Sequence, residues 1–116
     1  MLEKRRFKRI PCEYEASFTL LGTEQAPSIQ EVSVRDLSEG GLRFRSSRFI
    51  SLREKMLFTL LIPKTKPLRM VATPAWVSEL PRLNQFDIGT SFEMVSEEDR
   101  GLLRRLVNET KGARLA

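Results

Sequence analysis

Alternating apolar and polar residues are the feature that most limits what this chain can fold into. Between residues 14 and 20, an apolar side chain occupies every second position, and charged or hydroxyl-bearing side chains lie between them. Further apolar-rich runs, bounded by turn-forming residues, follow near residues 30–35, 42–45, 56–62, 68–77 and 86–92. A period of two is typical of a strand with one buried face. The sequence therefore predicts six β-strands.

The periodicity changes near the C-terminus. Ser96, followed three residues later by Asp99, resembles a capping box, and acidic residues suit the positive end of a helix. Apolar side chains then recur at helical spacing between Leu102 and Leu106, and Gly112 is the expected stop. The sequence therefore predicts a helix over residues 96–111 that buries its apolar stripe on the strands or on a partner.

The length and the order of the predicted elements define the architecture. With 116 residues, the chain can build one hydrophobic core but not two. Short strands followed by one helix favour an all-β fold, either a small antiparallel barrel or a sandwich. We therefore expect a single domain over residues 1–116, with a basic flexible arm at 1–9, the strands at 10–94 and the helix at 96–111.

Composition limits the function. Lys and Arg number 20 against 15 Asp and Glu, and the net charge of +5 favours an anionic partner such as nucleic acid, a nucleotide or an acidic membrane. The absence of histidine removes the commonest general base and the commonest metal ligand. We therefore expect no catalytic residues, no metal site and no enzymatic activity.

Two further features concern the location of the protein. Its single cysteine, Cys12, cannot form an intramolecular disulfide, which fits a reducing cytoplasm. The sequence shows no signal peptide and no run of the about 18 apolar residues that a membrane span needs. We therefore expect a cytoplasmic protein without a membrane span.

A basic arm precedes the first predicted strand. Five of the six residues 4–9, in the stretch EKRRFKRIP, are cations. Such an arm can be a solvated tail, and composition alone leaves that interpretation open. However, it runs directly into Ile10 and Pro11 at the first strand, and it is rich in arginine. The guanidinium fork binds phosphate through paired hydrogen bonds and stacks on nucleobases, which favours a ligand that carries both groups.

The short polar stretch DLSEGG connects two predicted strands. An isolated stretch of this kind is usually only a hairpin turn, because Asp and Ser bond the local backbone and glycines supply positive φ. If the strand geometry continues through it, however, Asp36 and Ser38 share one outward face. A carboxylate beside a hydroxyl would suit the donors on the Watson–Crick edge of guanine, and the O6 and N7 acceptors of guanine match arginine.

Together, the two stretches resemble the signature of one family. The pattern R-x-x-x-R, from Arg5 to Arg9, and the pattern D-x-S-x-x-G, from Asp36 to Gly41, are similar to the signature of the PilZ domain. The stretches PAWV and FDIGTSF resemble later strands of that family, so the resemblance covers nearly the whole chain. It implies a six-stranded antiparallel β-barrel with one C-terminal helix.

The resemblance also implies a ligand and a set of contacts. PilZ domains bind cyclic di-GMP, a bacterial second messenger with two guanines and two phosphates, and the resemblance implies no other cofactor. The arginines would contact phosphate and guanine, the aspartate and serine would read a guanine edge, and the glycine would let the backbone pass close to the ligand. Lys4, directly before the signature, leaves the number of bound ligands open. The implied ligand-binding residues are Arg5, Arg6, Arg9, Asp36, Ser38 and Gly41.

A mechanism follows from these assignments as a hypothesis. Without ligand, the charged arm is flexible; on binding, it folds over the barrel and builds a surface for a downstream partner protein. One alternative is a small basic barrel that binds nucleic acid. It explains the charge but not Asp36 and Ser38, because a phosphate backbone repels a carboxylate. Another alternative is a protein-interaction adaptor that docks through its helix independently of any ligand.

Structural or solvent-exposed roles are expected for four other residues. Pro74 interrupts a predicted strand, which indicates an edge or a bulge at that point. Trp76 is expected to pack in the core or at the barrel edge. Arg43 and Arg45 are expected to form part of a solvated face rather than of a ligand site.

Overall fold

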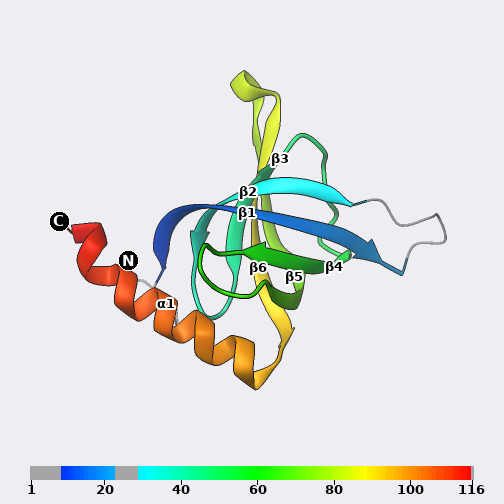
Figure 1. The fold of residues 1–116 in the computed structure, drawn as a ribbon. Coiled ribbons are helices and arrows are strands. Elements are labelled where there is room, and N and C mark those ends of the chain that lie inside the picture. Colours follow the sequence, from blue (N-terminus) through cyan, green and yellow to red (C-terminus); the bar gives the residue numbers. More distant parts are fainter. Residues whose placement is uncertain (1–8, 23–28, 116) are drawn as a thin grey trace, which may run out of the picture.

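The strands of the protein form a small barrel with one helix beside it (Figure 1). The structure, a computed structural model, describes residues 9–22 and 29–115. Helix α1 runs beside the start of β1 (Figure 1). In chain order, the elements are β1 (Ile10–Leu21), β2 (Gln30–Leu37), β3 (Leu42–Ser46), β4 (Lys55–Leu61), β5 (Leu68–Leu80), the 3-10 turn η1 (Pro81–Leu83), β6 (Gln85–Val95) and α1 (Glu97–Leu115).

The six strands close into a barrel in the order β1-β2-β3-β6-β5-β4. Every neighbouring pair is antiparallel, including β1 with β4, which completes the ring. Closure leaves no open sheet edge along the ring, which removes the usual site of strand-to-strand aggregation. The prediction of a six-stranded antiparallel barrel with one C-terminal helix is confirmed.

Three phenylalanines form the centre of the core. Phe18, Phe44 and Phe58 come from β1, β3 and β4, and their ring centroids lie between 5.1 and 5.5 Å apart. Each is at most 2% exposed. Tilted and edge-to-face pairs at this separation add to the free energy gained by burying the rings. The alternating apolar positions of the sequence therefore point into the barrel.

Helix α1 packs its apolar stripe on the barrel. Leu103 is 0% exposed and Val107 is 3% exposed, and both belong to the same cluster as the barrel core. The hydroxyl of Ser96 accepts a hydrogen bond from the backbone N–H of Asp99 at 3.1 Å, which caps the helix. The helix runs to Leu115 instead of ending near residue 111, because a glycine such as Gly112 costs only about 1 kcal/mol relative to alanine. Within the described part of the chain, no helix has the length and apolar character needed to cross a bilayer.

Candidate ligand-binding site

A cleft of about 620 Å³ opens where the β2–β3 turn meets β6 and the start of β1. Its lining comes from distant parts of the sequence. The cleft has a cationic residue from the start of the described chain, a carboxylate from β2 and an aromatic ring from β5. Of the residues implied by the family resemblance, the cleft brings together Arg9, Asp36, Ser38 and Gly41. Arg5 and Arg6 lie outside the described residues.

The register of β1 against β2 explains why Arg9 reaches this cleft. Ile10 lies opposite Leu37, and the two strands are antiparallel. The residue before Ile10 and the residue after Leu37 therefore lie at the same end of the pair. Arg9 is exposed, and Ser38 begins the turn beside it. The arm is thus attached at the rim of the cleft, next to the turn with which the sequence associates it.

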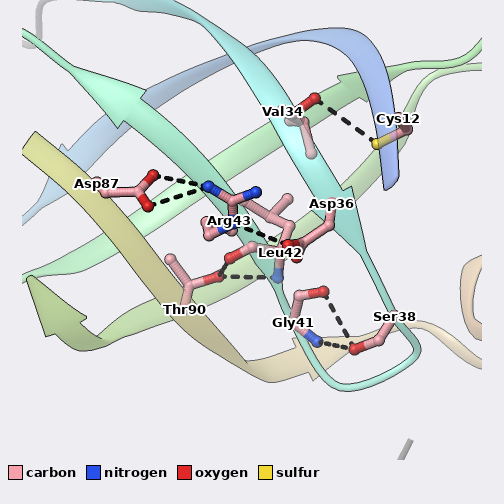
Figure 2. A network of polar contacts seen from close by, with 9 residues as sticks. All are labelled: Cys12, Val34, Asp36, Ser38, Gly41, Leu42, Arg43, Asp87 and Thr90. Carbon is pink, nitrogen blue, oxygen red and sulfur yellow. Dashed lines mark hydrogen bonds and ion pairs between the residues drawn. The ribbon is translucent and has the colours of Figure 1, made fainter. Parts of the chain in front are cut away.

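Ser38 is not part of a continued strand, so its side chain does not share the outward face of Asp36 as predicted. Strand β2 ends at Leu37, and the side chain of Ser38 is buried at 7% exposure. Its hydroxyl accepts hydrogen bonds from the backbone N–H groups of Gly40 and Gly41, at 3.1 and 3.2 Å, and donates to the carbonyl of Gly41 at 3.3 Å. Figure 2 shows the two hydrogen bonds between Ser38 and Gly41. Ser38 therefore does not point outward beside Asp36 but holds the turn in shape.

Gly41 is required by close packing rather than by its backbone angles. Its φ is not positive, whereas a Cβ atom at this position would clash with the backbone carbonyl of Thr90 on β6. The hydroxyl of Thr90 donates to the carbonyl of Leu42 at 2.9 Å and accepts from its N–H at 3.2 Å (Figure 2). The N–H of Phe92 donates to the carbonyl of Gly40 at 2.8 Å. The turn is thus pinned against β6.

Asp36 is held by a network centred on Arg43 (Figure 2). The Nε of Arg43 donates to Oδ2 of Asp36 at 2.7 Å, and one terminal nitrogen donates to both carboxylate oxygens of Asp87 at 3.0 Å. The side chains are 17–27% exposed. The hydrogen bond with Asp36 raises the pKa of Arg43 further above its usual value, despite the opposing effect of burial. Arg43 therefore stays charged and orients Asp36.

Arg43 is a site residue that our sequence reasoning assigned to a solvated face. A signal was available in the hairpin itself. When Leu37 lies opposite Leu42, as the register shows, Asp36 lies opposite Arg43. Opposite charges at directly facing positions of an antiparallel pair attract each other. Counting outward from the turn would therefore have paired the two residues.

Trp76 also lies in the cleft, whereas the sequence predicts that it packs in the core or at the barrel edge. The register shifts between Pro74 and Trp76, which confirms the predicted irregularity at the proline. Across the strands, Trp76 faces Gly89, and a Cβ atom on Gly89 would overlap the indole ring. The missing side chain of Gly89 thus makes room for the ring, which stays half-buried and forms part of the cleft wall.

Helix α1 touches the same turn. The Nε of Arg104 donates to a carboxylate oxygen of Glu39 at 2.6 Å, and Arg100 lines the cleft. The side chain of Arg104 is 59% exposed, so this ion pair contributes at most about 1 kcal/mol. The contact nevertheless connects the cleft physically with the helix.

The chemistry available in the cleft is that of binding. Among residues 9–22 and 29–115, no three His, Cys, Asp or Glu side chains lie close enough together to hold a metal ion. The cleft offers an oriented carboxylate for N–H donors, a guanidinium for anionic oxygens and an aromatic surface for a planar ring. These three groups suit an anion that carries a heterocycle.

Comparison with known proteins identifies the family. The family model described as "PilZ domain" matches residues 3–109, so the chain belongs to the PilZ domain family. No curated protein gives a significant match to the chain.

Several solved structures share the fold at low sequence identity. The PilZ domain of Escherichia coli YcgR with c-di-GMP has a TM-score of 0.74 at 17% identity, covering 96% of this chain and 94% of that one. Bacillus subtilis MotI/DgrA has a TM-score of 0.80 at 11% identity, covering 97% and 54%. The K. pneumonia MrkH–c-di-GMP complex has a TM-score of 0.74 at 13% identity, covering 99% and 56%. The chain therefore spans about half the length of MotI/DgrA and MrkH.

Proposed function

We propose that this chain is a cyclic di-GMP receptor domain. Membership of the PilZ family supports the proposal, as do the YcgR and MrkH structures, which are described as c-di-GMP complexes. The single observation that carries it for this chain is the meeting of Arg9 with Asp36 in one cleft. Arg9 belongs to one half of the signature and Asp36 to the other, and both line this cleft although they are far apart in sequence.

The proposed pose follows from the chemistry of each group. Asp36 accepts from the N1–H and N2–H donors of one guanine, because its carboxylate carries acceptors only. Arg9, together with Arg5 and Arg6, binds the phosphates and the O6/N7 edge of guanine. Trp76 offers its indole face to a base. Ser38 and Gly41 contribute by shaping the turn that bears the ligand.

Ordering of the arm is part of the proposal. Fixing one backbone residue costs about 1–2 kcal/mol. A hydrogen bond to a charged group contributes about 1.5–3 kcal/mol, so several contacts from the arginines offset the cost of ordering residues 4–9. Binding a dianion also reduces repulsion among the five cations of the arm. The arm therefore folds over the cleft only when the ligand is present.

The proposed output is a signal to another protein. The contact between Glu39 in the turn and Arg104 on α1 supports this, because any ligand that shifts the turn also changes a contact of the helix. We propose that the ordered arm and the part of α1 around Arg104 form the surface that a downstream partner binds. The domain acts as a ligand-binding receptor in the cytoplasm and not as an enzyme.

Nucleic acid is a weaker candidate for this site. Asp36 and Glu39 both line the cleft. Asp87 accepts a hydrogen bond from Arg43, which also lines the cleft. A phosphate backbone that followed the arm into the cleft would meet these carboxylates, which repel it. A compact ligand with guanine donors turns the carboxylate of Asp36 into a favourable contact.

Calorimetric titration tests the proposal. We expect saturable binding of cyclic di-GMP, with weak or no binding of GTP and of a short single-stranded RNA at the same salt concentration. A ligand held by charge alone loses affinity steeply as salt rises, whereas hydrogen bonds to a base edge do not. Binding of the RNA alone, with a steep salt dependence, would refute the receptor assignment.

Replacement of Arg43 tests the role of the network. In Arg43→Leu, Asp36 loses the donor that orients it and is left facing Asp87 without a counter-charge. We expect the affinity for cyclic di-GMP to fall about tenfold, corresponding to about 1.4 kcal/mol. Arg48→Leu is the matched control, because Arg48 is exposed and its side chain makes no hydrogen bond to any described residue. Equal affinities of the two variants for cyclic di-GMP would show that Arg43 does not contribute to ligand binding.

A further inference from the structure

Three arginines lie on the outer face of β2 and β3, and their environments differ. Arg43 donates to Asp36 and to both oxygens of Asp87. The side chains of Arg35 and Arg45 make no hydrogen bond or ion pair with any described residue. Asp87 lies opposite Arg45 in the register of β3 and β6. However, both carboxylate oxygens of Asp87 accept hydrogen bonds from Arg43. The acidic residue nearest to Arg45 in the sheet is therefore already engaged.

Both unpaired arginines carry a buried donor. The Nε atoms of Arg35 and Arg45 are shielded from solvent, and no acceptor among residues 9–22 and 29–115 reaches them. Buried polar groups in proteins nearly always have a partner, and each exception calls for an explanation. A buried donor on a charged group is costly to leave unpaired. Since these Nε atoms are shielded in this structure, an incoming acceptor satisfies them once the two side chains turn toward it.

The two side chains line a second cavity. It measures about 290 Å³, lies outside the first cleft and shares no lining residue with it. Ser33, Ser47 and Gln85 also line it and add neutral donors. The carboxylate residue of the lining, Glu31, is exposed and forms no ion pair with either arginine in the described chain. The cavity is therefore rich in donors and positive in charge.

We propose that this cavity is a second anion site, which binds a phosphate group. Two guanidinium forks supply paired N–H donors, and their planar geometry matches phosphate oxygens. A phosphate group carries enough oxygens to accept from both forks and from the neighbouring hydroxyl and amide groups. The site is independent of the proposed cyclic di-GMP cleft.

Nuclear magnetic resonance tests the proposal directly at the guanidinium groups of Arg35 and Arg45. Inorganic phosphate is titrated into the protein labelled with nitrogen-15, and the Nε–Hε signals of arginine are followed. We expect the signals of Arg35 and Arg45 to shift saturably. Chloride at matched ionic strength is the control for screening. If chloride reproduces the shifts, or if they rise linearly without saturation, the proposal is wrong.

A double variant separates the two sites. We expect Arg35→Gln/Arg45→Gln to weaken phosphate binding at least about tenfold, because each lost charge-assisted hydrogen bond is worth that much. Arg53→Gln/Arg82→Gln removes the same charge from exposed positions outside the cavity and should bind phosphate as the unmodified protein does. Cyclic di-GMP affinity should be equal in both variants. A loss of cyclic di-GMP binding only in Arg35→Gln/Arg45→Gln would show that the cavity is not a separate site.

A diester probe identifies the source of the phosphate. Dimethyl phosphate offers two free oxygens, as a nucleic acid or a cyclic dinucleotide does, whereas inorganic phosphate resembles a monoester. Saturable shifts of Arg35 and Arg45 with both probes assign a diester, and shifts with inorganic phosphate alone assign a monoester. Both outcomes support the site, and a failure of both probes overturns it.

Discussion

Replacing Arg5 and Arg9 together with alanine is expected to weaken cyclic di-GMP binding at least about a hundredfold. Each arginine is assigned at least one charge-assisted hydrogen bond, worth about 1.5–3 kcal/mol, and about 1.4 kcal/mol corresponds to a factor of ten. The barrel should remain folded, because Arg9 is exposed and precedes the first strand. Calorimetry measures the affinity, and far-ultraviolet circular dichroism measures the fold.

A charge-matched variant makes this result specific. Arg53→Ala/Arg82→Ala removes two positive charges from exposed positions outside the cleft. If long-range attraction alone held the ligand, both double variants would lose similar affinity, and the loss would shrink at high salt. We expect a large loss only in Arg5→Ala/Arg9→Ala. Retained affinity in that variant, with an intact fold, would remove the arm from the site.

Gly41→Ala is expected to lower the free energy of unfolding by about 1–3 kcal/mol and to weaken ligand binding as well. The added methyl group meets the backbone carbonyl of Thr90, so either the turn or β6 must move. Movement of the turn would also break the hydrogen bond from Phe92 to Gly40, which is 2.8 Å long. Urea unfolding measures the loss of stability.

The chain supplies a matched control for this substitution. Gly101 lies inside α1, and a Cβ atom there would have nothing within 4 Å. Gly101→Ala is therefore expected to stabilise the protein by about 0.5–1 kcal/mol, because alanine has the higher helix propensity. If Gly41→Ala unfolds at the same urea concentration as the unmodified protein, the close approach of the turn to β6 is not a constraint.

The strands of this fold could be predicted from the sequence because each has one buried face. The alternation of apolar residues from position 14 to 20 became the inward face of β1, with Phe18 at its centre. Closure of the barrel is different, since it depends on the pairing of β1 with β4, which no local pattern encodes. The antiparallel barrel was predicted through the family signature rather than through periodicity.

The candidate site was only partly predictable, for a related reason. In the sequence, Asp36 stands out as a carboxylate at the start of a turn, and Arg9 stands out as part of a basic cluster. Arg43 and Trp76 acquire their place through cross-strand neighbours, Asp36 and Gly89 respectively, and this pairing depends on register. The proline itself indicated the register shift beside Pro74, whereas the shift within the β2–β3 pair could not be located from residue patterns.

Ser38 shows that the alternation of side-chain directions along a strand stops where a turn begins. Its position two residues after Asp36 predicts a shared face, but β2 ends one residue earlier. Once the strand ends, the hydroxyl is within reach of two backbone N–H groups, and bonding them satisfies buried donors at little cost. The serine of the signature therefore acts on the turn, and in the proposed pose the aspartate alone faces the ligand.

A crystal structure of the chain with cyclic di-GMP tests the central claim most directly. We predict that the ligand occupies the cleft between Arg9 and the β2–β3 turn, with guanine N1–H and N2–H facing the carboxylate of Asp36 and the phosphates against Arg5 and Arg9. A ligand bound anywhere else on the barrel, or one in this cleft whose guanines are turned away from Asp36, would contradict the account.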